Sequence, residues 1–216
     1  YQIPTFLFIN KMDQVGTDKE KVLDDVSFCV NAGVIFGIVG RNGSGKSVLM
    51  KIICGLAAPT SGHIVIDEKI IGKDIDFPEN LGAIIEQPAF MQFASGFKNL
   101  KFLADINKKI DKAEIRSTME MVGLNPDSKK WVMNYSLGMK QRLSIAQAIM
   151  ENPELIILDE PMNGLDKEMV NWLRGYLKEE SDKGHTIIIS SHIQEDIDIL
   201  CDHVIELDRG CIVNAG

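Results

Sequence analysis

The sequence predicts an α/β fold with a phosphate-loop core, a small antiparallel β subdomain and an inserted helical subdomain. A glycine-rich loop, residues 40–47, lies between an apolar run of strand length, 34–39, and a helical segment, 48–54. This order is that of a phosphate-binding strand–loop–helix unit. A second apolar run, 155–158, ends in two carboxylates, as buried parallel strands do where ligands bind. Residues 89–133, between these units, show helical periodicity.

The length and composition are those of one domain. At 216 residues, the chain can bury a sizeable core, so we expect a single domain over residues 1–216 with 89–133 as its helical insertion. The net charge of −8 gives no indication of a nucleic-acid partner. We expect no membrane span, because no apolar run approaches the roughly 18 residues that cross a bilayer, and no secretory signal.

The cysteines predict a reduced, cytoplasmic protein. They show no CxxC spacing and stand mostly among apolar neighbours: Cys29, Cys54, Cys201 and Cys211. We interpret them as core thiols, with metal binding as the alternative.

The glycine-rich loop has the residue types that a polyphosphate requires. It reads Gly40-Arg41-Asn42-Gly43-Ser44-Gly45-Lys46-Ser47 and fits the pattern GxxxxGK[ST]. Its glycines keep Cβ atoms away from the backbone amides, and the following helix start favours anions. We expect these residues and Val48 to contact phosphate, with Lys46 at the β- and γ-phosphates and Ser47 on Mg²⁺. The alternative is a glycine-rich turn with an incidental lysine.

The N-terminal part predicts the small β lobe. Residues 5–9 and the alternating residues 26–30 indicate antiparallel strands, and the polar residues 10–21 indicate a loop between them. After a turn at 59–62, residues 63–67 indicate another strand.

A short strand of the main sheet, 81–85, precedes the helical insertion. Apolar residues of the insertion recur at helical spacing: Phe97, Leu100, Leu103 and Ile106, then Ile115, Met119 and Val122. We interpret its methionines and phenylalanines as core packing rather than ligand contacts.

The C-terminal part continues the main sheet. An amphipathic helix is indicated by Met169, Trp172, Tyr176 and Leu177. Strands at 186–190, 204–207 and 212–213 follow it.

One segment carries a family resemblance that extends over nearly the whole chain. Tyr135-Ser136-Leu137-Gly138-Met139-Lys140-Gln141-Arg142 is similar to the LSGGQ signature of ATP-binding cassette (ABC) ATPases, the nucleotide-binding subunits of ABC transporters. Tyr135, Leu137 and Met139 depart from that pattern, whereas Ser136 and Gly138 match it. A hydroxyl and a glycine amide at a helix start make a second anion site, so we expect Ser136 and Gly138 to contact phosphate; a simple helix cap is the alternative for Ser136.

The resemblance also implies the catalytic groups. Asp159 resembles the aspartate that holds Mg²⁺, and Glu160 resembles the base that polarises the attacking water. Adjacent side chains at a strand end diverge, so they can divide these tasks; the alternative is a solvated acidic turn. His192 resembles the switch histidine that contacts the γ-phosphate, and with Glu160 and Lys46 it completes the expected catalytic set. Asp166 lies in a segment similar to the D-loop, which crosses the dimer interface.

Two positions depart from the family pattern. Aligned through Pro88, the glutamine that senses the metal site falls on Glu86, with Gln87 one residue later. Gln87 has the amide side chain of the family residue, so it is favoured as the metal-site residue, and Glu86 is the alternative. The aromatic residue that stacks on adenine is missing, because Asp13 and Val15 stand where it is expected. Apolar contact or weak stacking would then replace it.

The resemblance implies a Mg²⁺-dependent ATPase that binds ATP between two subunits in a head-to-tail homodimer or heterodimer. It implies a transmembrane permease as the partner, docked by the helical insertion, with the ATPase in the cytoplasm at the inner face of the membrane. Residues 82–86, 135–142 and 190–193 resemble the bacteriocin, lantibiotic and multidrug (ABC-2 type) export branch. One alternative is a non-transport ABC ATPase acting on ribosomes or DNA, and another is a regulatory ATP-binding module without turnover.

Overall fold

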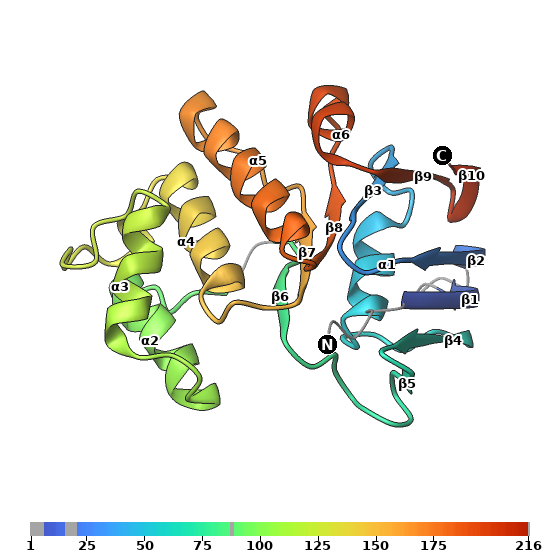
Figure 1. Ribbon diagram of the computed structural model, residues 1–216, viewed down its shortest axis with the longest axis horizontal. Coiled ribbons are helices and arrows are strands. Elements are labelled where there is room, and N and C mark those ends of the chain that lie inside the picture. The colour runs from blue at the N-terminus through green and yellow to red at the C-terminus, as the bar shows by residue number, and fades with distance from the viewer. Residues whose placement is uncertain (1–6, 16–20, 87–88, 216) are drawn as a thin grey trace.

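The computed structural model describes residues 7–15, 21–86 and 89–215, with side chains from Val22 onward (Figure 1). Its central sheet has the strand order β10-β9-β3-β8-β7-β6, and every neighbouring pair is parallel except β10 with β9. The strands are β3 (Ile35–Gly40), β6 (Leu81–Ile84), β7 (Leu155–Asp159), β8 (Thr186–Ser190), β9 (His203–Asp208) and β10 (Cys211–Ala215). The carboxyl ends of β3, β8 and β7 therefore lie next to one another, where ligands bind in such sheets.

The small sheet is antiparallel and has the order β2-β1-β4-β5. It comprises β1 (Leu7–Val15), β2 (Lys21–Val30), β4 (Ser61–Ile66) and β5 (Lys69–Ile70). The predicted β lobe is present, but the predicted loop over residues 10–21 is wrong for most of its length. Residues 10–15 continue β1 and pair with β2 and β4, because backbone pairing on both sides overrides the polar side chains of an irregular strand. The start of the first predicted strand lies outside the described residues.

The helices gather in two places (Figure 1). Helix α1 (Lys46–Ile53) lies between the two sheets, and α5 (Lys167–Asp182) and α6 (Gln194–Leu200) accompany the central sheet. At the far end of the molecule from the small sheet lie α2 (Gly96–Asn107), α3 (Lys112–Met121), the 3₁₀ turn η1 (Val132–Asn134) and α4 (Leu137–Ile149). The predicted helical insertion thus forms its own layer, beginning as a helix at residue 96 rather than 89.

Alternate residues of the central strands face two hydrophobic cores. In β7, Ile156 and Leu158 pack with the helices α2 to α5, whereas Leu155 and Ile157 pack with α1 and the small sheet. All four are nearly or fully buried. A strand covered on both faces needs an uninterrupted apolar run, which is why this strand could be predicted from sequence.

The packing prediction for the insertion is only partly right. Met119 and Phe90 are buried, but Phe93, Phe102 and Ile106 are 73%, 56% and 64% exposed. The helices of the insertion bury one stripe each, so apolar residues outside that stripe face solvent.

The cysteine prediction is also only partly right. Cys54 is buried, and burial raises the pKa of its thiol to about 12. Cys201 and Cys211 are half-buried, and Cys29 is exposed, because its position in β2 faces outward. Within the described ranges, no group of three or more histidine, cysteine and acidic residues could hold a metal ion.

Candidate active site

The phosphate loop connects the carboxyl end of β3 to the start of α1. Gly40, Gly43 and Gly45 have φ values of +148°, +79° and +108°, a region that side chains with a Cβ rarely adopt. A Cβ on Gly40 would lie 2.3 Å from the Leu207 carbonyl oxygen. The sequence prediction of glycines for backbone reasons is therefore confirmed at these positions.

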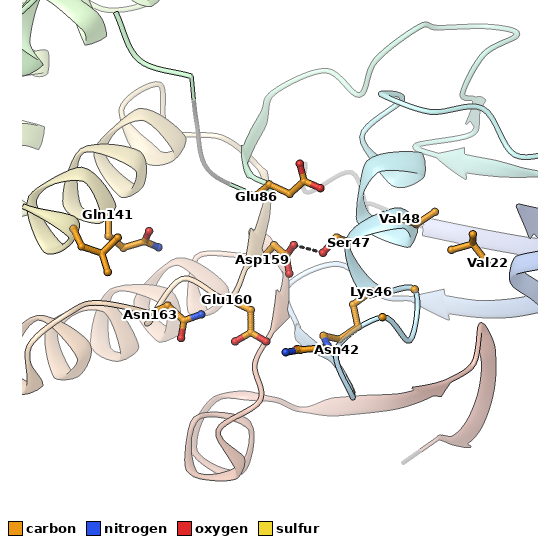
Figure 2. A pocket seen from close by; sticks show the side chains of 13 residues that line it. Val22, Asn42, Lys46, Ser47, Val48, Glu86, Gln141, Asp159, Glu160 and Asn163 are labelled. Atoms are coloured by element: carbon orange, nitrogen blue, oxygen red, sulfur yellow. Dashed lines mark hydrogen bonds between the residues drawn. The ribbon is translucent and has the colours of Figure 1, made fainter. Parts of the chain in front are cut away.

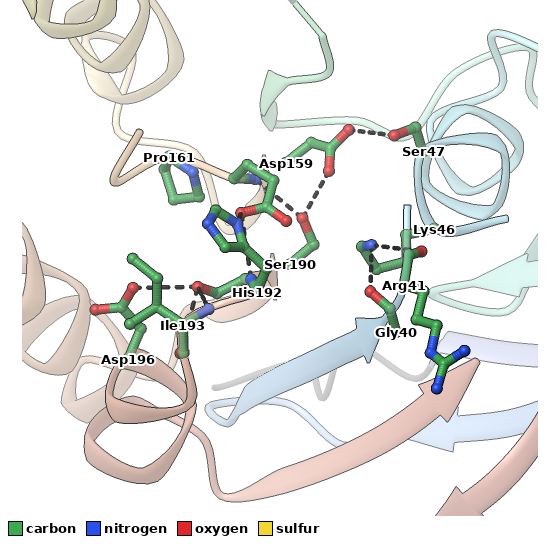
Figure 3. A network of polar contacts seen from close by, with 12 residues as sticks. Gly40, Arg41, Lys46, Ser47, Asp159, Pro161, Ser190, His192, Ile193 and Asp196 are labelled. Atoms are coloured by element: carbon green, nitrogen blue, oxygen red, sulfur yellow. Dashed lines mark hydrogen bonds and ion pairs between the residues drawn. The ribbon is translucent and has the colours of Figure 1, made fainter. Parts of the chain in front are cut away.

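Lys46 is held inside the loop. Its side chain is 7% exposed, and Nζ donates to the carbonyl oxygens of Gly40 at 2.7 Å and Arg41 at 3.3 Å (Figure 3). These neutral acceptors leave the charge of the ammonium unpaired among its described hydrogen bonds. The loop therefore presents a buried cation on its concave side, which suits a polyanion.

A chain of hydrogen bonds joins α1 to the ends of β7 and β8. Ser47 Oγ donates to Asp159 Oδ2 at 2.6 Å, and Ser190 Oγ donates to Asp159 Oδ1 at 2.6 Å (Figure 3). Ser190 Oγ in turn accepts the backbone N–H of Glu160 at 2.9 Å. Asp159 and Ser190 are register partners in the parallel β7–β8 pair, so the sheet itself places the hydroxyl beside the carboxylate.

Glu160 and His192 form the other arm of the site. His192 Nδ1 lies 2.6 Å from Glu160 Oε2, and the His192 backbone N–H donates to the same oxygen at 3.3 Å. Glu160 has a φ of +50°, an uncommon conformation for a residue other than glycine that is often found at functional sites. This turn directs Glu160 away from Asp159, as divided roles for the two carboxylates require.

Asp159, Glu160 and part of the phosphate loop line a cavity of about 610 Å³ (Figure 2). The lining combines the phosphate loop and the two carboxylates with residues of β2, α4 and the loop after β7. They are Val22, Asn42, Gly43, Gly45, Lys46, Ser47, Val48, Glu86, Leu137, Gln141, Asp159, Glu160 and Asn163. The size is in the range of small-ligand sites. Val22 contributes an apolar wall. The side chains of Asp13 and Val15 are not among those that the structure describes.

The structure bears on the choice between Glu86 and Gln87. Glu86 lines the cavity and pairs with Lys51 of α1, with Nζ 2.5 Å from Oε1. Gln87 lies outside the described residues. Glu86 is therefore within reach of the site, and the preference for Gln87 stays a prediction.

Gly40, Arg41 and Ser44 of the phosphate loop and His192 are not among the residues that line this cavity. Three expected phosphate-contacting residues of the segments before α4 and α5, Ser136, Gly138 and Asp166, do not line it either. Ser136 caps α4, accepting the Met139 N–H at 3.2 Å, which is compatible both with a simple helix cap and with a phosphate contact. Gly138 follows it in the first turn of α4, against the Gly164 carbonyl. Asp166 caps α5 through the Met169 N–H at 2.9 Å and pairs with Arg142. A contact of these three with nucleotide therefore stays a prediction that concerns a second subunit.

The departures at Tyr135 and Leu137 have different surroundings. Tyr135 is 7% exposed, and its hydroxyl accepts the Gly96 N–H at 3.3 Å, so it packs within the helical layer. Leu137 is 62% exposed and lies against Gly164. Only the second substitution changes the exposed surface of the site.

The residues present fit a magnesium nucleotide. The Ser47 hydroxyl and the Asp159 carboxylate meet at the cavity wall, and Mg²⁺ keeps several waters, so few protein ligands suffice. Within the described part of the chain, Ser44 Oγ is buried and has no hydrogen-bond partner. A buried hydroxyl without a partner is a donor that a phosphate oxygen could satisfy.

Comparison with known proteins identifies the family of this chain. A family model described as ABC transporter matches residues 23–163. The uncharacterized ABC transporter ATP-binding protein YybJ of Bacillus subtilis (strain 168) is 43% identical over 192 residues, covering 89% of this chain and 88% of that relative. The chain belongs to the ABC transporter family.

Two further relatives of this ABC protein have transport named in their descriptions. The lantibiotic transport ATP-binding protein SrtF of Streptococcus pyogenes is 35% identical over 196 residues, covering 90% of this chain and 84% of SrtF. The bacitracin transport ATP-binding protein BcrA of Enterococcus faecalis is 39% identical over 200 residues, covering 89% of this chain. The chain spans only 63% of BcrA.

Solved structures confirm the predicted ABC ATPase fold. An ATP-binding subunit of an ABC transporter superposes with a TM-score of 0.87 at 28% identity, covering 98% of this chain and 90% of its own. A dimeric cassette in a post-hydrolysis state, bound to ADP and Pi, superposes with a TM-score of 0.86 at 20% identity and 97% coverage of both chains. The protein is an ABC ATPase domain, homologous to ATP-binding proteins of bacitracin and lantibiotic transport. None of its described helices is long and apolar enough to cross a bilayer.

Some residues of this ABC site were missed by the sequence analysis. Ser190, which links the two carboxylates, had no assigned role, and Gln141 and Asn163 were not expected at the cavity. Their placement depends on strand register and on how α4 meets the loop after β7, where Gln141 Nε2 donates to the Pro161 carbonyl at 2.8 Å. Such long-range contacts leave no local pattern in the sequence.

Proposed function

We propose that this ABC ATPase binds Mg·ATP at residues 40–48 and hydrolyses it with Glu160 as the base. Hydrolysis drives export of a drug, peptide or bacteriocin through a separate permease. The observation that carries the proposal is the connected set of hydrogen bonds from Ser47 through Asp159 and Ser190 to Glu160 and His192. It ties the phosphate loop to both carboxylates, so the groups that must act together are positioned together.

Each group has a task that its geometry supports. The loop amides and the Lys46 ammonium stabilise the negative charge of the triphosphate. Ser47 and Asp159 would hold Mg²⁺, which supplies charge neutralisation at the β- and γ-phosphates when bound. Glu160 orients and deprotonates a water, and His192, whose Nδ1 lies 2.6 Å from Glu160 Oε2, would contact the γ-phosphate. Val22 would contact the adenine ring of ATP in place of a stacking aromatic side chain.

A second ATPase subunit would complete the site. Ser136, Gly138 and Asp166 stand at the starts of α4 and α5 and are not among the residues that line the cavity of their own chain. In a head-to-tail homodimer or heterodimer, these residues meet the nucleotide bound by the partner. The exposed Leu137 side chain would then lie in the subunit interface.

The permease contact is proposed on the helical insertion. Two backbone hydrogen bonds, from Val132 to Ala94 and from Met133 to Gln92, join its two irregular segments. On these segments Phe93 packs edge-to-face on Trp131 with ring centroids 5.6 Å apart, yet both side chains are largely exposed. Exposed aromatic pairs of this kind mark protein interfaces. Binding there would hold the ATPase in the cytoplasm at the inner face of the membrane.

The substrate class rests on the relatives. BcrA and SrtF are described as transporting bacitracin and a lantibiotic, which are peptide antibiotics. We therefore propose a peptide of that kind as the transported molecule, with its selection made by the permease.

The first experiment measures Mg²⁺-dependent phosphate release from ATP across protein concentration, for the wild type and Glu160→Gln. We expect specific activity to rise with concentration, because the site is shared between subunits. Glu160→Gln should keep ATP binding and lose about 10²- to 10⁴-fold in turnover, the usual contribution of a general base. Unchanged turnover in Glu160→Gln would remove Glu160 as the base.

Two other outcomes would favour the alternatives. ATP binding without turnover at any concentration, also with candidate permeases, would favour a regulatory module. Tight, salt-sensitive binding to nucleic acid would favour a non-transport ABC ATPase.

A further inference from the structure

A buried ion pair connects helix α5 to the turn that carries His192. Arg174 of α5 donates to Asp196 Oδ1 from Nε at 3.0 Å and from Nη2 at 2.5 Å. The Asp196 side chain is 1% exposed and that of Arg174 13%. Burial of a carboxylate is unfavourable unless its oxygens are fully hydrogen bonded, so the position of the second Asp196 oxygen is informative.

That second oxygen is linked to the turn of His192 through the Ser191 hydroxyl. Ser191 Oγ lies 3.1 Å from Asp196 Oδ2 and donates to it. The same hydroxyl accepts the Ile193 N–H at 3.1 Å. Ser191 and Ile193 are the chain neighbours of His192, and Figure 3 shows Asp196 beside Ile193 and His192 on this turn. The Asp196 carboxylate therefore holds the hydroxyl of the residue before the histidine, and that hydroxyl binds the backbone N–H of the residue after it.

His192 itself depends on this support. Its side chain is 55% exposed, and its Nδ1 meets Glu160 Oε2 at 2.6 Å. A ring that is mostly in solvent gains little orientation from packing, so its direction follows from the backbone that carries it.

We propose that Arg174 and Asp196 are positioning residues for ATP hydrolysis, which act through Ser191 to hold His192 against Glu160. The proposal rests on the roles of Glu160 and His192 proposed above. Neither Arg174 nor Asp196 touches the cavity, and both act by limiting the motion of the turn. A small displacement of a group near the reacting atoms can lower turnover by about 10²-fold without altering binding.

The chain provides a matched control on the same arginine. Arg174 Nη1 also pairs with Glu195 Oε1 at 3.2 Å, but the Glu195 side chain is 70% exposed and lacks a link to Ser191 among its described contacts. Partial burial lowers the pKa of Arg174, but the hydrogen bonds and charges of Asp196 and Glu195 raise it overall. The arginine is therefore charged throughout the working pH range. Glu195→Gln removes one charge beside Arg174 and leaves the positioning contacts intact.

The first test compares Asp196→Asn with Glu195→Gln in the full chain. For Asp196→Asn we expect kcat to fall about 10- to 100-fold, with the Kd for Mg·ATP within about twofold of wild type and unchanged binding stoichiometry. Glu195→Gln should stay within about twofold of wild type in kcat. Arg174→Lys, which keeps a donor and a charge, should retain more turnover than Arg174→Met. The proposal is overturned if Asp196→Asn turns over normally, or if bound ATP per chain falls in parallel with kcat.

The second test does not depend on turnover. In hydrogen exchange of the ATP-free protein, Asp196→Asn should accelerate exchange of the amides at 191–193 and leave the amides of β7 at wild-type protection. Equal acceleration throughout the domain, or none at the turn, would contradict a positioning role. The two proposals fail in different ways. If the proposed function is wrong, Glu160→Gln hydrolyses ATP normally. If only the positioning role is wrong, Glu160→Gln is inactive and Asp196→Asn is active.

Discussion

Replacing Ser190 with alanine tests the link between the two carboxylates. The Ser190 side chain is 0% exposed, and alanine removes only its hydroxyl, so no new contact is forced. The change deletes the donor to Asp159 Oδ1 at 2.6 Å and the acceptor of the Glu160 N–H at 2.9 Å. Both carboxylates then lose a fixed point, although neither is itself altered.

The expected loss of stability follows from these two bonds. A hydrogen bond to a charged group contributes about 1.5–3 kcal/mol and a neutral one about 1 kcal/mol. Their sum, roughly 2.5–4 kcal/mol, is the expected decrease in the free energy of unfolding. For a domain of this size, about 1 kcal/mol shifts Tm by roughly 2–4 °C, so Tm should fall by roughly 5–15 °C.

The assay is thermal and urea unfolding of Ser190→Ala, with ATP turnover measured well below the variant's Tm. Ser144→Ala is the control, because Ser144 is equally buried, at 2% exposure. Its hydroxyl donates to the Lys140 carbonyl of its own helix at 2.9 Å, a bond whose loss changes stability by less than about 1 kcal/mol. If Ser190→Ala is no less stable than Ser144→Ala, or hydrolyses ATP at the wild-type rate, Ser190 does not hold the carboxylates.

Three further predictions concern other parts of the chain. Burial raises the pKa of the Cys54 thiol from 9.0 to about 12, so the unfolded thiol ionises first. This thiol should lower the free energy of unfolding above about pH 9 by up to about 1.4 kcal/mol per pH unit. Because burial raises the pKa of Cys201 to about 12 as well, urea titrations should show that Cys54→Ala reduces the slope without abolishing it. At Gly45, φ is +108°, and a Cβ added there would lie 2.8 Å from Leu23 Cδ2. Gly45→Ala should therefore lower the affinity for Mg·ATP by about 10-fold or more, measured by equilibrium binding. Wild-type affinity would contradict the assigned loop geometry. Asp111 and Glu114 form a capping box at the start of α3. Asp111→Ala should therefore lower the free energy of unfolding by about 1 kcal/mol in urea titrations without changing kcat. A decrease in kcat would show that α3 contributes to the site.

The nucleotide half of the site was predictable because its requirements are local. A phosphate loop needs glycines at fixed spacing, and Gly40, Gly43 and Gly45 adopt the positive φ values that this spacing indicated. Asp159 ends the strand β7, whose other residues form an apolar run, and His192 comes two residues after the end of β8 at Ser190. The phosphate loop and the acidic strand end each lie within a few residues, so they could be predicted without a structure. The roles of Asp159, Glu160 and His192 were implied by the family resemblance.

The N-terminal strands and the insertion were less predictable. Residues 10–15 are polar, yet they form part of β1 because β2 and β4 pair with them on either side. Phe93 and Trp131 are apolar, yet they lie on the surface and pack on each other. In both places the outcome depends on neighbours that are distant in sequence, which composition and periodicity do not record.

By itself, then, the sequence predicted the α/β fold, the phosphate loop and the acidic strand end at Asp159 and Glu160, because short-range geometry fixes which residue types these features need. It indicated His192 only through the family resemblance. Only the tertiary structure decided how they connect. The register of β7 on β8 sets Ser190 opposite Asp159, and the packing of α5 beside α6 brings Arg174 to Asp196. Pairing of strands and helices that are 22 to 31 residues apart is settled by burial of shared surfaces rather than by any local pattern.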